Sequence, residues 1–547
     1  MSTSGSPAGT TGPATMAAIG RAAMAIAAVT ILARALGFFR VVVFAHSVGA
    51  ATCLGSAYYT ANLVPNIIFE IVAGGALAGL VVPVLAGAVE RGESDIAGHT
   101  ASALLSWAVL LLTPLAVLTA VLAGPVMRLL YAPRVPGCDP AAVTGLGSRM
   151  LVVFAPQVVL YGVAVVLTGV LQAHRRFLGP AAAPLLSSLV VIAAYLLYAA
   201  LSTGQTDALR GLSVPRELAL SLGTTLGVAA LALPLLVPMH RAGVRLRPAL
   251  RFPAGVAPRV RALALSGAAV LVAQQASVAV VVHLAGSYAP RGGIVLYTLA
   301  WTLFLLPWAI LAVPIATSAF PTLSARAEGG DHAGFAAVVA GSTRAVLLCT
   351  AGAAAALVAT AEPAARVLIQ GTRGTPDPHE LAAAVIAFAP GLIGYGLVAQ
   401  LGRALFAANA GSAAAVAIGI GWVAVIVADL VVVPAAPRGR GVAALGIGNT
   451  VGMTVAGLLL LAALFARAGR AALAGLPRAA AAGALGAVVG GLAGARVAAA
   501  WSGSGLLASL GAVVLAGATV LAVFGAVVLV ADGRDLRALL ARRYAGV

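Results

Sequence analysis

Residues 154–173 read FAPQVVLYGVAVVLTGVLQA, and residues 388–407 read FAPGLIGYGLVAQLGRALFA. The two stretches are identical at eight of 20 positions, all at an offset of 234. Leu and Ala matches arise easily by chance in a sequence this rich in both residues, but Phe, Pro and Tyr in register do not. Each stretch is also an apolar run of the length that crosses a bilayer. The pair therefore predicts an internal repeat in a membrane protein.

The composition excludes a soluble fold. The chain has 547 residues, of which 61% are hydrophobic and 9% charged, whereas soluble domains carry roughly 25% charged residues. Its mean hydropathy is +1.06. Fourteen apolar runs are long enough to be helical spans, near 20–45, 57–88, 100–126, 148–173, 178–201, 217–239, 262–287, 294–322, 335–360, 381–408, 412–435, 441–466, 475–500 and 505–531.

The basic residues predict the orientation of these spans. All 33 are Arg, giving a net charge of +18. A basic balance can indicate nucleic-acid binding, but here the arginines lie in short loops between apolar runs. If the N-terminus is cytoplasmic, eighteen fall inside, ten outside and five within spans. Because cytoplasmic loops are enriched in Arg, we expect both termini in the cytoplasm, which agrees with an even number of spans.

The repeat also predicts the domain organisation. It relates the fourth span to the tenth, and a shift of six spans preserves orientation. We therefore expect an all-α protein with two six-helix lobes related by a pseudo-twofold axis along the membrane normal, as in transporters with a substrate site between repeats. The predicted segments are a disordered cytoplasmic tail (1–16, without signal-peptide features), an N-terminal lobe (17–240), a basic cytoplasmic linker (241–261), a C-terminal lobe (262–466), two further spans (467–531) and a cytoplasmic tail (532–547).

Two arginines lie inside the first span, Arg34 and Arg40. Their six-residue spacing separates them by ~9 Å along a helix and ~120° around it, so they can line a broad cavity wall. Ionisable groups at this depth usually face a cavity or a partner. Arg forks bind phosphate oxygens bidentately, which favours a pyrophosphate ligand. The alternative for either residue is that it snorkels to the interface.

The second span contains Glu70, preceded by Pro65-Asn66 and followed by Gly74-Gly75. The proline loosens a helix, and the glycines allow bending or close packing, so these four residues are predicted hinge or packing positions. We expect Glu70 to belong to the substrate site and to pair with Arg34 or Arg40. The pair would be either a structural ion pair or a proton-coupling element.

Further polar residues occur in the C-terminal half. Arg403 in the tenth span is a candidate for the substrate site. Asp429, with Asn449 and Thr450 in the next span, offers oxygen ligands that could hold Na⁺ as a coupling ion. The alternative is a hydrogen bond that packs two helices. We expect no other cofactor.

Catalytic and redox motifs are absent from the sequence. There is no phosphate-binding Gly-rich loop, HExxH motif or nucleophile elbow, so we expect no enzyme. Cys53, Cys138 and Cys349 have no metal or redox spacing, and we interpret all three as structural thiols. A membrane glycosyltransferase would need carboxylates or a metal at the membrane face, where only scattered acids occur, such as Glu90 and Asp95.

Several motifs of the N-terminal half resemble one family. They are RALGFFR at 34–40, Gly49-Ala50, Tyr58-Tyr59, Pro65-Asn66, Val82-Pro83, GVLQAHRRF at 169–177, Pro180 and Ala183-Pro184. Together they resemble the MurJ/MviN lipid II flippases of the multidrug/oligosaccharidyl-lipid/polysaccharide exporter superfamily. The version with Glu70 and Gly74-Gly75 is similar to the actinobacterial branch.

The resemblance implies a specific function. Its members have two six-helix lobes and two C-terminal helices, which often bound a groove for the lipid tail. They work by alternating access around a cationic cavity, and their cargo is the undecaprenyl-pyrophosphate-linked peptidoglycan precursor. Arg34 and Arg40 match the family's span-one arginines, which are thought to engage the pyrophosphate. We thus expect a cell-wall transporter of the cytoplasmic membrane, monomeric, contacting lipids and cell-wall machinery but no nucleic acid.

The sequence departs from the family pattern at three positions. Ser56 replaces an acidic residue, and Phe69 and Thr302 replace arginines. This thinner charge set leaves two alternatives open: a flippase for another polyprenyl-pyrophosphate-linked glycan, or a transport-impaired paralogue that acts as a cell-wall scaffold. A drug/cation antiporter is disfavoured because the span-one arginines would repel cations.

Overall fold

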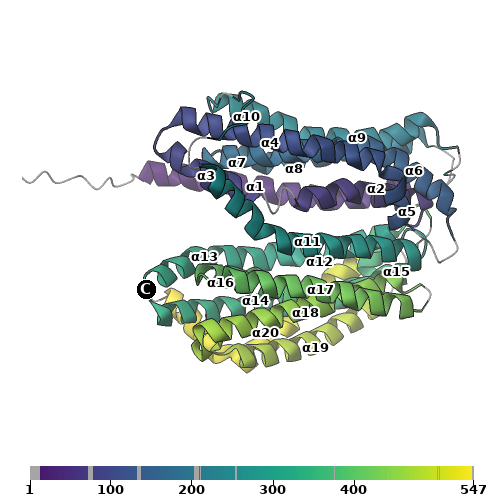
Figure 1. Cartoon of the computed structure of the whole chain (residues 1–547). Coiled ribbons are helices and arrows are strands. Elements are labelled where there is room, and N and C mark those ends of the chain that lie inside the picture. The colour runs from purple at the N-terminus through teal and green to yellow at the C-terminus, as the bar shows by residue number, and fades with distance from the viewer. Residues whose placement is uncertain are drawn as a thin grey trace, which may run out of the picture.

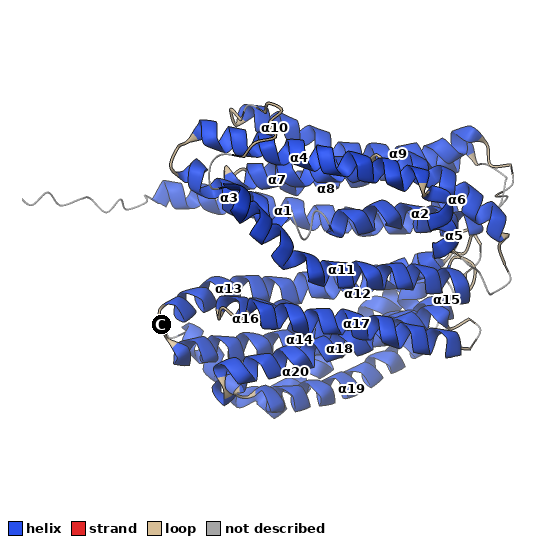
Figure 2. Cartoon of the chain, in the orientation of Figure 1, coloured by secondary structure: helices blue, strands red, loops and turns tan. Residues whose placement is uncertain are grey.

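The computed structural model describes residues 13–71, 78–131, 137–202, 209, 211–244, 246–252, 256–374, 376–437, 439–501, 503 and 505–544. Every regular element in these ranges is helical (Figure 2). The α-helices are α1 (Pro13–Phe44), α2 (Cys53–Phe69), α3 (Ala78–Glu90), α4 (Ser94–Val121), α5 (Ala123–Leu130), α6 (Pro140–Phe154), α7 (Gln157–Ala173), α8 (Leu178–Leu201), α9 (Val214–Ala232), α10 (Leu236–Arg241), α11 (Val256–Tyr288), α12 (Gly293–Pro307), α13 (Val313–Glu328), α14 (His332–Ile369), α15 (Pro378–Phe388), α16 (Gly391–Ala407), α17 (Gly411–Ala435), α18 (Gly441–Ala468), α19 (Leu476–Ala500) and α20 (Leu506–Tyr544).

The helices form two bundles (Figure 1). One contains α1 to α10, and the other contains α12 to α18, with α19 and α20 packed on α14. Helix α11 connects them, contacting α3 of the first bundle and α17 of the second. The start of α1 and the end of α20 lie at the same end of the molecule, where the bundles diverge (Figure 1).

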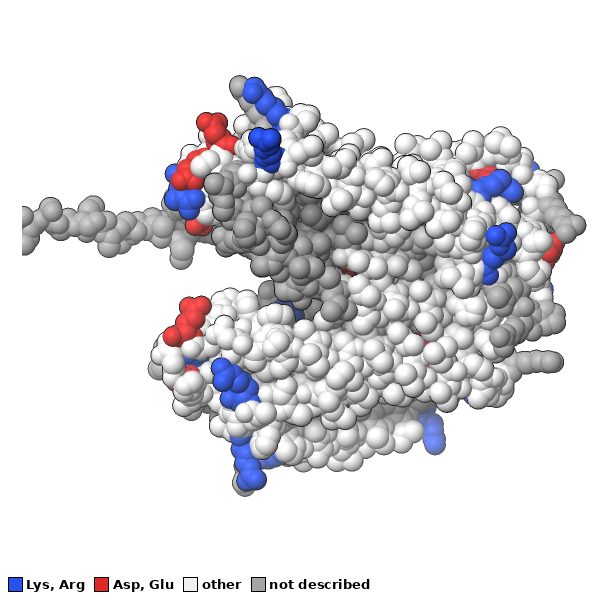
Figure 3. Space-filling view, viewed as in Figure 1, with Lys and Arg blue, Asp and Glu red and all other residues white. Residues whose placement is uncertain are grey.

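The membrane-spanning character predicted from the sequence is confirmed. In the described ranges, twelve helices are long and apolar enough to cross a membrane, or thirteen if the bent pair α15–α16 is one span. The predicted second span is divided between α2 and α3, and residues 72–77 between them lie outside the described residues. On the face shown in Figure 3, most charged side chains lie near the two ends of the molecule, and few lie between them.

The sequence repeat is also a structural repeat. Helices α6 and α7 are separated at Ala155-Pro156, and α15 and α16 at Ala389-Pro390, since proline lacks the amide that would continue the hydrogen-bond ladder. After both repeats the chain turns through a non-glycine residue in the left-handed region, Arg175 and Asn409, each with φ 56°. These positions again differ by 234, so the correspondence extends to single turns.

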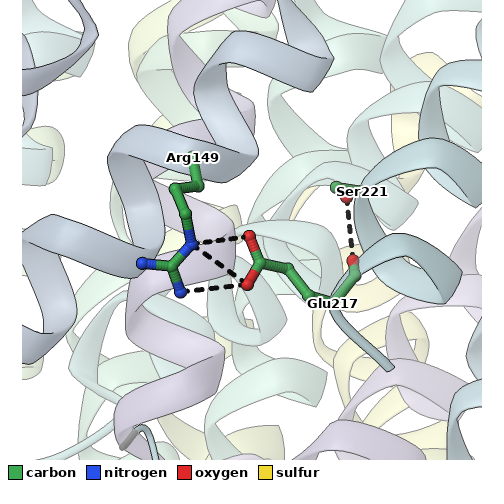
Figure 4. Close-up of polar contacts among 3 residues, drawn as sticks. All are labelled: Arg149, Glu217 and Ser221. Atoms are coloured by element: carbon green, nitrogen blue, oxygen red, sulfur yellow. Dashed lines mark hydrogen bonds and ion pairs between the residues drawn. The ribbon is translucent and has the colours of Figure 1, made fainter. Parts of the chain in front are cut away.

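An ion pair joins two helices of the first bundle (Figure 4). Arg149 of α6 donates from Nε to both carboxylate oxygens of Glu217 (3.0 and 3.2 Å) and from Nη2 to Oε2 (2.9 Å). Ser221 donates to the Glu217 carbonyl at 2.8 Å. Since the Glu217 side chain is only 15% exposed, the two-point contact fixes the α6–α9 end of the bundle.

The segment before α11 is bound to α4. The amides of Arg247 and Ala249 donate to Ser102 Oγ and Ser106 Oγ at 3.0 and 3.1 Å, and Trp107 Nε1 donates to the Leu250 carbonyl at 2.9 Å. These contacts fix residues 246–252 to the first bundle. Any rotation of one bundle against the other must therefore be accommodated in α11 or just before it.

Small residues allow a close helix crossing in the second bundle. At Gly452 of α18, a Cβ atom would lie 2.6 Å from the Gly421 carbonyl oxygen and 2.8 Å from the Val425 nitrogen. At Gly419 of α17, by contrast, a Cβ would meet nothing within 4 Å. Close approach of backbones at glycine is a common way to pack helices in membranes.

We predict that Gly452→Val destabilises the protein, because the added carbons must separate α17 from α18, at a cost of about 1–3 kcal/mol. Gly419→Val is the matched control and should behave like the wild type. The measurement is the thermal unfolding midpoint in detergent. Equal midpoints for the two variants would contradict the packing described for this crossing.

Candidate functional site

At the end opposite the termini, the two bundles meet through backbone contacts. We call this contact the gate; it comprises residues 46–55 of the first bundle and residues 290–295 and 370–374 of the second. Gly292 (φ 77°) and Gly374 (φ 88°) both abut Ala51. A Cβ on Gly292 would lie 2.5 Å from Ala51 Cα, and one on Gly374 would lie 2.7 Å from the Ala51 carbonyl carbon. Only glycine fits both the backbone angle and the space.

Two further contacts stabilise the gate region. His46 Nε2 lies 3.3 Å from the Gln370 carbonyl oxygen across the gate. Cys53 forms a disulfide with Cys138, which ties the start of α2 to the segment before α6. The predicted free thiols are therefore wrong for these two residues: they are 85 apart in sequence, and only the folded chain brings their Cα atoms to 5.7 Å. Cys349 is a free thiol.

Toward the termini, the molecule is hollowed between the bundles (Figure 3). Deeper between them lies a cavity of about 240 Å³, which we call the central cavity. Its walls come from α2, α11, α12, α17 and α18, so both bundles contribute. Among its lining residues are Asn66, Glu70, Gln275, Tyr297, Trp301 and Asn449.

Arg40 lies in a hydroxyl-rich part of the first bundle. The guanidinium is half-buried, and its electrostatic neighbours are tyrosines, namely Tyr58, Tyr59, Tyr161 and Tyr195. Within the described residues, no carboxylate forms an ion pair with Arg40 or with Arg34, whose side chain is exposed. A cation without a counter-ion at this depth is suited to hold an anionic ligand.

The tyrosines around Arg40 are themselves fixed by hydrogen bonds. The Tyr58 hydroxyl lies 2.8 Å from the Tyr195 hydroxyl and 2.7 Å from Thr224 Oγ1. This network joins α2, α8 and α9. It holds the site rigid, and the hydroxyls satisfy one another without carrying a charge that would neutralise Arg40.

Glu70 lies at the end of α2 and lines the central cavity. The predicted ion pair between Glu70 and Arg34 or Arg40 does not occur among the described residues. Instead Tyr161 interacts electrostatically with both Arg40 and Glu70, and its hydroxyl donates to Asn66 Oδ1 at 2.9 Å.

The predicted hinge residues are only partly described. Pro65 is buried inside α2, and Asn66 Nδ2 donates to the Asn62 carbonyl at 2.9 Å. The pair thus sits in a continuous helix next to the cavity. Gly74 and Gly75 lie outside the described residues.

The three residues that stand where the family has a charged side chain each make a local contact. Ser56 donates to the Thr52 carbonyl (3.3 Å), and Thr302 donates to the Thr298 carbonyl (2.6 Å). Phe69 packs on Tyr161 with ring centroids 4.4 Å apart. These side chains are satisfied within their own surroundings, so the positions add no charge to the cavity.

Asp429 on α17 is fully buried, and neither carboxylate oxygen has a hydrogen-bond partner among the described residues. It packs against the bare backbone of Gly448, next to Asn449, whose buried Nδ2 also lacks a partner in that part of the chain. An unpaired buried carboxylate is costly, so this one needs a proton or a cation.

Thr450 does not complete the predicted set. Its hydroxyl donates to the Ala387 carbonyl at 2.6 Å and accepts from the Gly391 amide at 3.2 Å. Both partners flank the proline break between α15 and α16, where backbone groups lack their usual helical partners. The hydroxyl therefore pairs with backbone groups at this helix break and is not free to act as a third ligand beside Asp429.

Arg403 lies away from the other candidates. It is half-buried on α16, and its Nη1 donates to the Ala399 carbonyl of the same helix at 2.7 Å. It is not among the residues that line the central cavity. Arg40 is not in the lining either, but Tyr161 interacts with both Arg40 and the cavity residue Glu70, whereas the one hydrogen bond described for the Arg403 side chain stays within its own helix.

The sequence analysis missed the aromatic residues of the cavity. Tyr297 and Trp301 of α12 and Trp422 of α17 line it, together with Gln274 and Gln275 of α11. The sequence does contain tryptophans and two adjacent glutamines inside aliphatic spans, and this pattern could have indicated a cavity wall. Neither type carries a charge, and in a sequence this apolar an uncharged aromatic or amide residue looks like helix packing.

Comparisons with known proteins place these features in a family. The family model described as lipid II flippase MurJ matches residues 44–511. A solved lipid II flippase MurJ in an inward closed conformation is similar in fold, with 16% identity, a TM-score of 0.73 and coverage of 93% of this chain and 99% of that chain. An inward-facing MATE-family multidrug transporter of the MOP superfamily is similar at 13% identity, with a TM-score of 0.63 and coverage of 81% and 94%. A MOP-superfamily transporter from Pyrococcus furiosus is similar at 13% identity, with a TM-score of 0.58 and coverage of 82% and 96%.

At these identities the solved structures show the fold alone, and the family model, which covers most of the chain, shows the family. Flippases are transporters and not a class of enzyme, which agrees with the absence of catalytic motifs from the sequence. The chain belongs to the MurJ family of lipid II flippases, multi-pass membrane proteins that translocate the lipid-linked precursor of the cell wall.

Proposed function

We propose that this chain carries the headgroup of lipid II across the cytoplasmic membrane by alternating access, with Arg40 and Arg34 engaging the pyrophosphate. One observation carries the proposal: Arg40 has no acidic partner among the described residues, and its neighbour Tyr161 is hydrogen-bonded to Asn66 in the wall of the central cavity. A pyrophosphate supplies the missing negative charge, and an Arg fork matches its oxygens.

The orientation follows from charge and from the disulfide. With a cytoplasmic N-terminus, eighteen arginines fall inside and ten outside. The Cys53–Cys138 disulfide then lies at the outer end, where disulfides form and persist. This placement supports cytoplasmic termini, and it makes the conformation in Figure 1 open to the cytoplasm and closed outside.

Transport in this scheme needs no covalent chemistry. The headgroup enters from the cytoplasm while its lipid tail stays in the bilayer. The pyrophosphate binds Arg40 within its ring of tyrosine hydroxyls. Rotation of the lobes then separates Ala51 from Gly292 and Gly374 and exposes the headgroup outside.

Asp429 provides a means of resetting the cycle. We propose that its carboxylate takes up Na⁺, with Asn449 beside it as an oxygen donor. The support is the unpaired buried carboxylate in the lobe opposite Arg40. Binding and release of the cation would change the charge of the second lobe and so bias its position against the first.

We predict that the Arg34→Ala, Arg40→Ala double variant fails to support growth when the native copy is depleted, because the pyrophosphate loses its counter-charge. Arg403→Ala should support normal growth, since the one hydrogen bond that its guanidinium makes among the described residues is to its own helix. Full rescue by a stably expressed double variant would argue for a scaffold instead of a flippase.

We predict that Gly374→Val prevents closure of the gate, because the added side chain would collide with Ala51. In a Cys349→Ala background, a membrane-impermeant thiol reagent added outside should label Ser56→Cys several-fold faster in this variant. Gly371→Val is the matched control, since Gly371 also has a positive φ but a Cβ there meets nothing within 4 Å. Equal labelling in both variants would show that Gly374 does not close the outer face.

We predict that Asp429→Asn reduces lipid II transport in proteoliposomes by about tenfold or more and removes its response to a Na⁺ gradient, since an amide cannot balance the cation's charge. The measurement compares initial rates with and without the gradient. A variant that retains both the rate and the gradient response would rule out Asp429 as the coupling site.

A further inference from the structure

The wall of the central cavity that belongs to the second lobe is aromatic. It consists of Tyr297 and Trp301 on α12 and Trp422 on α17, and we call it the aromatic wall. The rings of Tyr297 and Trp301 are parallel within 6°, with centroids 6.4 Å apart. Trp301 also packs against the cluster that contains Trp422. Three large rings thus form one continuous side of the cavity.

Other aromatic side chains hold this wall in place. The Trp301 ring lies 5.2 Å from Phe304, 5.8 Å from Phe388 and 6.2 Å from Tyr395, between centroids. Phe304 and Phe388 are almost fully buried. A ring supported from behind in this way loses little conformational freedom when a ligand stacks on it.

Amide side chains stand beside the aromatic wall. Gln274 and Gln275 come from α11 and Asn449 from α18, and all three line the cavity. Gln275 is 4% and Asn449 3% exposed, and Asn449 Nδ2 has no partner among the described residues. Glu70 is the one charged side chain among the residues identified in the lining. This part of the cavity therefore offers hydrogen bonds and ring faces, and no positive charge for a phosphate.

Such a surface matches a sugar. A pyranose ring has an apolar face of C–H groups, which packs on an aromatic ring. Its edges carry hydroxyl or acetamido groups, which pair with amides because Asn and Gln both donate and accept. The volume of about 240 Å³ is below the roughly 300–1,000 Å³ of sites for drug-sized ligands, so it suits one ring and not a whole headgroup.

We propose that the aromatic wall, with Gln275 and Asn449, binds an acetamido-bearing sugar ring of the lipid-linked cargo. This inference rests on the proposed flippase function and adds a division of labour to it. Arg40 on the first lobe holds the pyrophosphate, while the second lobe recognises the sugar. A cargo with both parts bridges the lobes, whereas a polyprenyl pyrophosphate without sugar engages the first lobe alone.

The division of labour has a consequence for selectivity. A buried amide left without a partner penalises the wrong ligand by more than a good contact rewards the right one. The sugar-free carrier lipid leaves Gln275 and Asn449 unpaired. The transporter therefore distinguishes its loaded cargo from the bare carrier through the second lobe.

The test compares two probes on the purified full chain in lipid nanodiscs: lipid II, and undecaprenyl pyrophosphate without sugar. We expect the wild type to bind lipid II about tenfold or more tightly than the sugar-free probe. Gln275→Leu and Trp422→Leu should each abolish most of this preference and leave the affinity for the sugar-free probe unchanged. Ala276→Leu, at an exposed neighbouring position on α11, is the matched control and should keep the preference.

Two results would overturn the inference: equal affinity of the wild type for both probes, or variants that weaken both probes alike. Failure of the proposed function looks different, because the wild type would then bind neither probe, or Arg40→Ala would leave both affinities unchanged. If Trp422→Leu lowers the thermal midpoint, Gln275→Leu decides the question, since it keeps the side-chain volume and changes only the polar group.

Discussion

The charge of Arg40, which no carboxylate neutralises among the described residues, is the constraint on which the rest of the structure depends. A guanidinium within a membrane-spanning helix is costly unless it faces water, a counter-ion or a cavity. Its neighbours here are tyrosines. The Tyr58 hydroxyl is hydrogen-bonded to Tyr195 and to Thr224, and these three residues come from three different helices. The first lobe is therefore organised to keep a positive charge available. This is why we propose that its ligand is an anion that enters from outside the protein.

An available positive charge can serve transport only if the cavity opens to one side of the membrane at a time. The gate provides this through Gly292 and Gly374, which bring backbone against backbone at Ala51. The linker is fixed to α4 by hydrogen bonds, so any movement of one lobe against the other would have to be accommodated in α11 or just before it. The second lobe then contributes the aromatic wall and an amide, a surface that we propose binds the sugar of the cargo.

Sequence reasoning predicted the features that depend on local pattern. The repeat around Pro156 and Pro390 gave the lobes and even the positions of two helix breaks, because proline acts on its own helix. Arg34 and Arg40 could be named as candidates because a charged residue stands out in an apolar span, and their role in binding stays a prediction. Features that depend on three-dimensional proximity were not predictable. They are the Cys53–Cys138 disulfide, the hydrogen bonds of Thr450 to the break between α15 and α16, and the interaction of Tyr161 with both Glu70 and Arg40. The aromatic wall was missed because its residues are apolar and look like core.

The central claim is that this chain brings lipid II to the outer face of the cytoplasmic membrane. Its most direct test is depletion of the protein in its host, followed by measurement of the lipid II accessible to an impermeant reagent on intact cells. The account predicts that externally accessible lipid II falls sharply while total lipid II is maintained or rises. Unchanged external accessibility after depletion, in cells without a second copy, would contradict it.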